Sequence, residues 1–191
     1  MEDEPQFQQR LDKLTEAVVY LVWGSRSDPN FGEPKLVKLL YYADCAAYRR
    51  FGAPMTGTTY LHYPHGPYPS DWYKSKRAMQ AAGDVQVRQE DVIGVHRVYR
   101  QHRWIAKRSA RSEVLSAAER AILDEQLLRF ADFNAAGMEE YSHQELGWLS
   151  TEDGEPIPYC MAGLSDAPLS DDELCEAERI AADVARKRTA V

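Results

Sequence analysis

The sequence of 191 residues predicts an α+β fold: a single, mostly helical domain with a small antiparallel sheet or hairpin in the middle of the chain. Three observations predict it. Apolar residues recur at helical spacing towards both ends of the chain, Ser-x-x-Glu capping boxes precede two of these segments, and strand-forming residues alternate between positions 58 and 106.

Two helices are expected in the first quarter of the chain. Residues 7–23 carry an apolar stripe, and Gly24 with Ser25 ends that helix. Pro34 begins the second helix in its first turn, where a missing N–H costs no hydrogen bond. Gly52 suits the left-handed residue just past the end of this second helix.

The period of the apolar pattern is different in the middle of the sequence. Residues 58–63 alternate and are rich in strand formers, which predicts a short strand. Ser70 is the expected N-cap of a third helix, 71–82, that ends at Gly83. Residues 85–106 predict two or three further short strands, and these form the small sheet or hairpin.

Three more helices are expected over residues 117–134, 138–147 and 171–188. The first begins at a capping box of Ser116 and Glu119, and the last begins at a second box of Ser170 and Glu173. We therefore expect residues 1–191 to form one domain in which 165–191 is a C-terminal helical extension.

Composition excludes several classes. Hydrophobic residues make up 44% and charged residues 28% of the sequence, as in ordinary globular proteins. The first ten residues, MEDEPQFQQR, lack the basic flank and apolar core of a signal peptide, and no apolar run approaches the ~20 residues that span a bilayer. We expect a cytoplasmic protein with no membrane contact. Its three cysteines lack the C-x-x-C spacing of a zinc site.

Charge is unevenly placed. Residues 1–111 hold 17 basic and 12 acidic residues, whereas residues 112–191 hold 6 and 18. Either the two parts neutralise each other on folding, or the acidic part faces outward and steers a basic partner. Residues 97–111 contain six basic residues with Tyr99 and Trp104 among them, which fits either the outer face of a hairpin or an RNA contact. The overall acidic balance argues against nucleic acid as a partner.

No sequence motif of a P-loop, a dinucleotide site, a zinc protease or a serine hydrolase is present, and we expect no cofactor. The less favoured enzyme hypothesis is a small metal-dependent enzyme whose site would combine Asp44, His62, His65 and His143, with Asp71 as a further candidate ligand. Histidines that form hydrogen bonds within an aromatic surface are the alternative, so we predict no metal and no catalytic residue.

Asp44 falls on or near the stripe that should be buried. A buried carboxylate must be paired, hydrogen-bonded or protonated, so we expect it to bind backbone donors or an arginine, with the loop 52–60 as the nearest source. Cys45 lies in the middle of the same helix and is expected in the core. Lys35 and Lys38 oppose the helix dipole in its first turn, which marks either an anion or carboxylate contact or a solvated surface.

Aromatic residues concentrate in residues 60–73, where Gly66 and three prolines stiffen the backbone. Such a loop is typical of a recognition surface. We predict that a protein partner is contacted through six residues, with core burial as the alternative for the two tryptophans. These six are Tyr60, His62, Tyr68, Trp72, His143 and Trp148.

The order and spacing of several blocks resemble the Panacea, or SocA-like, antitoxin domain. The resemblance covers about residues 10–160 and rests on Lys35-Leu-x-Lys-Leu-Leu-Tyr-Tyr-Ala-Asp44, Gly52-x-Pro-x-Thr-Gly57, Tyr60, Gly66-Pro67, Ser142-His143, Trp148 and Gly154-Glu-Pro-Ile157-Pro. It implies a bacterial or phage-associated antitoxin that neutralises a toxin by direct contact, with a toxic small alarmone synthetase or another translation-targeting toxin as partner. It also implies an alternative, an adaptor that delivers the toxin to a protease.

Overall fold

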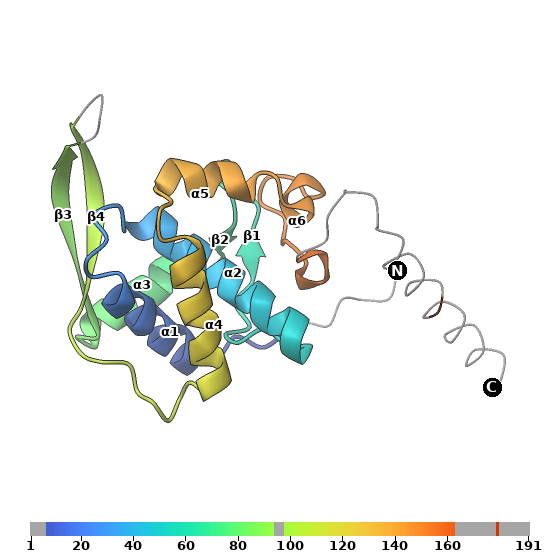
Figure 1. The fold of residues 1–191 in the computed structure, drawn as a ribbon, viewed down its shortest axis with the longest axis horizontal. Helices are drawn as coiled ribbons and strands as arrows, with labels where there is room; N and C mark the ends of the chain where they lie inside the picture. The colour runs from blue at the N-terminus through green and yellow to red at the C-terminus, as the bar shows by residue number, and fades with distance from the viewer. Residues whose placement is uncertain (1–6, 94–97, 163–178, 180–191) are drawn as a thin grey trace.

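The computed structural model describes residues 7–93, 98–162 and 179. Its fold is α+β and mostly helical, as predicted, with two small antiparallel sheets (Figure 1). The elements in sequence order are α1 (Leu11–Gly24), α2 (Glu33–Phe51), β1 (Tyr60–Leu61), β2 (Tyr68–Pro69), α3 (Trp72–Ala81), β3 (Val85–Ile93), β4 (Val98–Ala106), α4 (Ala117–Arg129), α5 (Ala135–Ser142), α6 (Leu146–Leu149) and the short 3₁₀ helix η1 (Tyr159–Met161).

Helix α2 is the centre of the molecule. It contacts α1, α4, α5, β2, β4 and η1, and every residue from Lys35 to Ala47 is buried (Figure 1). Pro34 lies in its first turn, as predicted, and Gly52 follows its last residue with a left-handed φ of 73°. The Gly52 N–H then closes the helix by donating to the carbonyl oxygen of Tyr48 over 2.8 Å. Because α2 is buried on all sides, its polar side chains must find partners inside the fold.

The two sheets are separate hairpins. In the smaller one, Leu61 of β1 pairs with Tyr68 of β2, and Leu61 also forms a bridge to Pro156. The predicted strand 58–63 is therefore present but shorter. In the larger hairpin, β3 and β4 are two nine-residue antiparallel strands in which Val85 pairs with Ala106, so the two or three short strands expected over residues 85–106 are two longer ones. This hairpin extends along one edge of the molecule (Figure 1).

Several predicted helix boundaries need correction. The N-cap of α3 is Asp71 and not Ser70, whose N–H instead donates to the carbonyl oxygen of Thr59. The capping box of Ser116 and Glu119 is confirmed, but the predicted helix 117–134 ends at Arg129. Asn134 then caps α5, because its side chain accepts from the Gly137 N–H.

Two further expectations concern the last third of the sequence. The predicted helix 138–147 is two helices, α5 and α6. The predicted helix 171–188 and its capping box lie outside the described residues, apart from Arg179. Within the part of the protein that the structure describes, no helix is long and apolar enough to cross a membrane.

Contacts between the basic and acidic parts of the sequence involve α4. Lys13 of α1 forms an ion pair with Glu119, and Arg50 of α2 binds Glu125 over 2.6 Å. The Tyr20 hydroxyl donates to Asp124 over 2.9 Å. The acidic residues of α4 are thus used to hold α4 against α1 and α2, which agrees with mutual neutralisation for this element.

Candidate functional site

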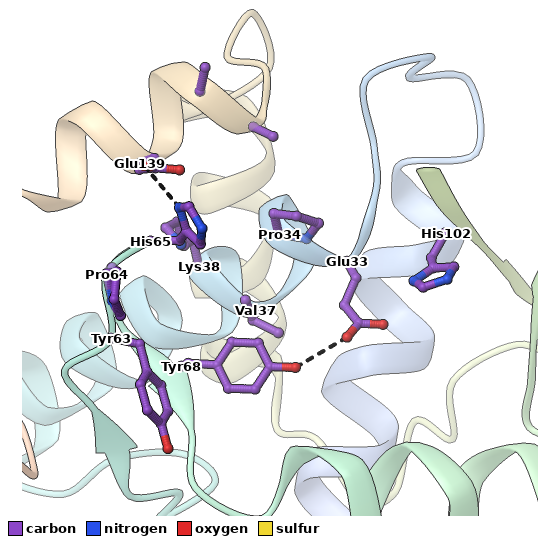
Figure 2. Close-up of a pocket in the computed structure, with 13 residues that line it drawn as sticks. Glu33, Pro34, Val37, Lys38, Tyr63, Pro64, His65, Tyr68, His102 and Glu139 are labelled. Atoms are coloured by element: carbon purple, nitrogen blue, oxygen red, sulfur yellow. Dashed lines mark hydrogen bonds and ion pairs between the residues drawn. The ribbon is translucent and has the colours of Figure 1, made fainter. Parts of the chain in front are cut away.

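A cavity of about 810 Å³ opens where the first turns of α2, the loop between β1 and β2, and the start of α5 meet (Figure 2). Its volume falls in the range of small-molecule sites, roughly 300–1,000 Å³. It is lined by Glu33, Pro34, Val37, Lys38, Tyr63, Pro64, His65, Gly66, Tyr68, His102, Ala135, Ala136 and Glu139.

Two tyrosines form an aromatic wall of this cavity. The rings of Tyr63 and Tyr68 meet edge to face with their centroids 6.1 Å apart. The Tyr68 hydroxyl donates to Glu33 over 3.2 Å, and Lys76 of α3 forms an ion pair with the same carboxylate. Burial, together with the nearby Glu33 charge, raises the pKa of Tyr68 above its ordinary value. Tyr68 therefore stays neutral and fixed, while Tyr63 is 40% exposed at the surface.

Lys38 lines the cavity from α2 and is only 3% exposed. Burial lowers the pKa of its amine from 10.5 to about 8, although the charge of Glu139 opposes this shift. Glu139 itself lies 3.1 Å from Nδ1 of His65 (Figure 2). The amine of Lys38 has no hydrogen bond or ion pair with any residue that the structure describes.

Gly66 allows the loop to close over Lys38. Its φ is +92°, and a Cβ built there would lie 2.9 Å from Lys38 Cε and even closer to Ser142 Oγ. A side chain at this position would be strained by the backbone and would also collide with α2 and α5. Because Gly66 has no side chain, the loop can pack directly against the aliphatic part of Lys38.

Beside the cavity, three of the predicted partner-binding residues form one stack. The Trp148 ring lies 4.2 Å from the His62 ring and 4.1 Å from the His143 ring, with both pairs nearly parallel. His62 Nδ1 lies 3.1 Å from the Thr151 hydroxyl, and Trp148 donates to the carbonyl oxygen of Tyr63 over 3.3 Å. The stack thereby links α6 to the loop that borders the cavity.

The other predicted contact residues are divided between surface and core. Tyr68 lines the cavity, but Tyr60 and Trp72 are each 1% exposed. Tyr60 donates to Asp44, and Trp72 packs on Trp104 with centroids 5.4 Å apart. Core burial is the predicted alternative for Trp72, and the structure shows core burial for Tyr60 as well. Neither ring can touch a partner in this conformation.

The candidate catalytic residues have separate partners, since Asp44 binds Thr56, His65 lies by Glu139, and His62 and His143 both stack on Trp148. Asp44 accepts hydrogen bonds from the Thr56 N–H over 2.7 Å and from the Thr56 hydroxyl, which confirms the expected backbone donor in the loop 52–60. Burial raises its pKa to about 6, since these bonds offset only part of the desolvation. Cys45 is buried, which raises the pKa of its thiol. Among the described residues, no group of three or more His, Cys, Asp and Glu could hold a metal ion.

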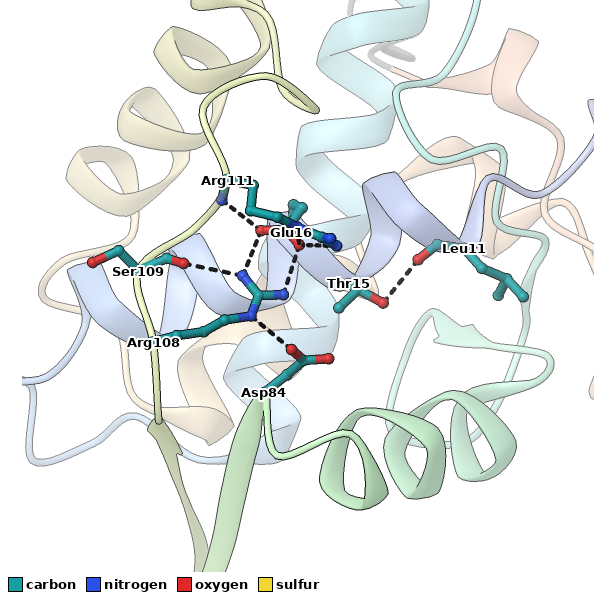
Figure 3. A network of polar contacts seen from close by, with 7 residues as sticks. All are labelled: Leu11, Thr15, Glu16, Asp84, Arg108, Ser109 and Arg111. Atoms are coloured by element: carbon teal, nitrogen blue, oxygen red, sulfur yellow. Dashed lines mark hydrogen bonds and ion pairs between the residues drawn. The ribbon is translucent and has the colours of Figure 1, made fainter.

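The basic segment 97–111 also has structural roles. The buried carboxylate of Glu16 accepts from Arg108 over 2.6 Å and from the Arg111 N–H over 2.7 Å (Figure 3). Burial alone would raise the pKa of Glu16, but the hydrogen bonds from both arginines outweigh it and lower the pKa to about 2. Arg103 donates to backbone carbonyl oxygens of the loop after α1. These three arginines bind carboxylate and carbonyl groups of the fold itself, and Arg108 and Arg111 lie beyond the end of β4.

Sequence reasoning missed most of the cavity. Glu33, Glu139 and Tyr63 were not candidates, because they come from segments far apart in the sequence and meet only in the fold. The sequence signal that pointed to this cavity was the pair of lysines, Lys35 and Lys38, in the first turn of α2. Lys35 confirms the carboxylate contact, because it binds Asp28 over 2.7 Å and the Phe133 carbonyl oxygen over 2.7 Å. Both lysines are buried rather than exposed on the surface.

A family model described as "Antitoxin SocA-like, Panacea domain" matches residues 36–149, more than half of the sequence. The matched range includes α2 from residue 36 onward, the loop between β1 and β2, α5 and α6, which supply most of the cavity and the stack. No protein of curated function and no solved structure matches this protein.

Proposed function

Because the chain belongs to the SocA-like Panacea family of antitoxins, we propose that it is an antitoxin that neutralises a cognate toxin by direct contact, and that the face around the cavity is its contact surface. The observation that carries this proposal is the cavity itself, a concave site bordered by aromatic side chains inside the matched range.

The aromatic residues at this face suit a protein interface. Buried aromatic anchors contribute most of the binding energy in many complexes, and rigid side chains lose little entropy on binding. Tyr63 is exposed at the cavity, and Trp148 is held between His62 and His143. We propose Tyr63, Tyr68, His62, His143 and Trp148 as contact residues. Tyr60 and Trp72 are buried in the core and are not among them.

The partner that this face suits is a basic protein. Glu139 and the exposed Glu140 place negative charge on α5 next to the cavity. Toxins that act on tRNA or ribosomes hold RNA on a basic surface, so an antitoxin docked there would compete with RNA. A translation-targeting toxin is the partner class we propose, and the family resemblance makes a toxic small alarmone synthetase one candidate within it. Excess RNA should displace the antitoxin from such a toxin, and failure to do so would contradict this step.

The test begins with the neighbouring reading frame. Its product should arrest growth when expressed alone, and co-expression of this protein should restore growth and yield a complex of the two. Tyr63→Ala should weaken the complex about tenfold or more. Tyr73→Ala is the matched control, since Tyr73 is 73% exposed and does not line the cavity. Equal effects of the two variants would move the contact surface elsewhere.

The protease-adaptor alternative gives a different result in the same assay. An adaptor would restore growth through a shorter toxin half-life, and rescue would be lost in cells that lack the protease. Rescue that persists there, with a stable complex, supports direct neutralisation. The enzyme alternative predicts rescue by turnover of a small molecule without any complex.

A further inference from the structure

Lys38 differs from the other buried lysine of α2. Lys35, one turn earlier, has three acceptors: Asp28 and the carbonyl oxygens of Ala131 and Phe133. Lys38 is as deeply buried, at 3% exposure against 2%, yet its amine has no hydrogen-bonding partner among the residues described. Burying an ammonium group without a partner costs several kcal/mol. The fold satisfies one lysine completely and leaves the other facing the cavity.

The acidic groups near Lys38 are already engaged. Glu139 acts on the Lys38 amine through its charge and forms no hydrogen bond with it, and its Oε1 lies 3.1 Å from Nδ1 of His65. Glu33 accepts from Tyr68 and pairs with Lys76. The three N–H bonds of Lys38 are therefore available to an acceptor that comes from outside the protein.

The remaining walls define the rest of the ligand. Pro34, Val37, Tyr63, Tyr68, Ala135 and Ala136 give the cavity a largely apolar lining. Two carboxylates, Glu33 and Glu139, also line it and would repel a multiply charged anion such as phosphate. The single ammonium group of Lys38 among these apolar walls is best matched by a monovalent anion that is attached to an apolar group.

We propose that this cavity binds an apolar group that ends in a carboxylate, with Lys38 as its counter-ion. This site goes beyond the proposed function, because it does not depend on a toxin. A small aryl or alkyl acid and the C-terminus of a partner protein both offer an apolar group that ends in a carboxylate. A charge-assisted hydrogen bond formed in a buried site contributes more than a neutral one.

Matched acid and amide probes test this proposal. The full-length protein is titrated calorimetrically with 3-phenylpropanoate and 3-phenylpropanamide, and with an acetyl-Ala-Ala-Phe peptide that has a free or an amidated C-terminus. Each acid should bind about tenfold more tightly than its amide. Tighter binding of the peptide acid would assign the site to the C-terminus of a polypeptide, and tighter binding of 3-phenylpropanoate would assign it to a small molecule.

Lys38→Met keeps the apolar stem and should abolish the preference for acids. Lys107→Met removes an equal charge from an exposed position outside the cavity and should keep the preference. In the unmutated protein, the NMR signal of the Lys38 Cε should report a higher amine pKa when the acid is bound and no change with the amide. The proposal is overturned if acid and amide bind alike, if Lys38→Met retains the preference, or if no probe binds at millimolar concentration.

Discussion

The hydroxyl of Tyr60 donates a hydrogen bond to the buried carboxylate of Asp44 over 3.0 Å, and so joins β1 to the middle of α2. The backbone N–H and the hydroxyl of Thr56 donate to the same carboxylate. Asp44 is thus an acceptor for three donors inside the core. This arrangement fixes the loop between α2 and β1 and gives the buried carboxylate a structural role.

Asp44→Asn is expected to lower the free energy of unfolding by about 3 kcal/mol, because the amide turns one acceptor atom into a donor that faces other donors. Urea denaturation measures this loss. Tyr60→Phe removes one bond and keeps the packing, so its cost should be about 1 kcal/mol. A stable Asp44→Asn variant would show that the three bonds contribute little.

Glu16 makes the fold sensitive to acid. Its pKa is about 2 in the folded protein and 4.5 ordinarily, so the stability that it contributes is present above pH 4.5 and is lost as the pH falls towards 2. Glu16→Gln should cost about 2 kcal/mol at neutral pH, and the difference from the unmutated protein should shrink across this range. Melting curves at several pH values test this, and a constant difference would contradict it.

Gly66→Ala should destabilise the protein by about 3 kcal/mol and also distort the cavity, since it adds a collision with Ser142 and Lys38 to the strain of a positive φ. Gly52→Ala is the matched control. Its φ is +73°, and nothing lies within 4 Å of the added Cβ, so only the backbone strain, about 1 kcal/mol, should appear. Equal losses for the two variants would rule out the collision.

Lys38→Met should raise stability at neutral pH by about 2 kcal/mol, because it removes an unpaired buried charge. The folded-state pKa of Lys38 is lowered to about 8, so the unmutated protein should gain stability as the pH rises from about 8 to 10.5, and the variant should not. His65, Glu139 and Glu33 face the same cavity and are kept in both proteins. A loss of stability in the variant would mean that Lys38 has a partner.

Trp72→Ala should cost about 4 kcal/mol of stability, because the ring is buried against Trp104. Tyr68→Ala should instead weaken toxin binding by about 2 kcal/mol, whereas Tyr68→Phe keeps the aromatic wall and most of the affinity. Thermal melting and binding calorimetry separate the two effects. A Trp72→Ala variant that melts normally but binds poorly would return Trp72 to the interface.

Local chemistry was enough to predict much of the fold. The left-handed Gly52, the first-turn Pro34 and the capping box at Ser116 depend on a few neighbouring residues, and all three are confirmed. The prediction of one continuous helix over residues 117–134 is wrong. The Asn134 side chain accepts a hydrogen bond from the Gly137 N–H and so begins a new helix, which competes with continuation of the first. The predicted N-cap Ser70 is one residue too early, because α3 begins after Asp71.

The candidate site was less accessible from sequence. The sequence predicts His62, His143 and Trp148 as partner-contact residues from their residue types, and the structure brings these three rings together. The cavity, by contrast, depends on how α5 sits against α2, which no local pattern encodes. Tyr60 is buried where its hydroxyl donates to Asp44. This pairing depends on the positions of both residues in the fold, so the sequence alone does not reveal it.

The edge of β1 is completed by residues that follow the matched range 36–149. The Ile157 N–H donates to the carbonyl oxygen of Tyr60, and the His62 N–H donates to that of Glu155, each over 2.8 Å. Phe7, from before α1, meets the Tyr159 ring with centroids 5.9 Å apart. A recombinant fragment trimmed to the family boundaries would therefore expose an open strand and aggregate, whereas one that runs from residue 7 to residue 162 keeps both closures.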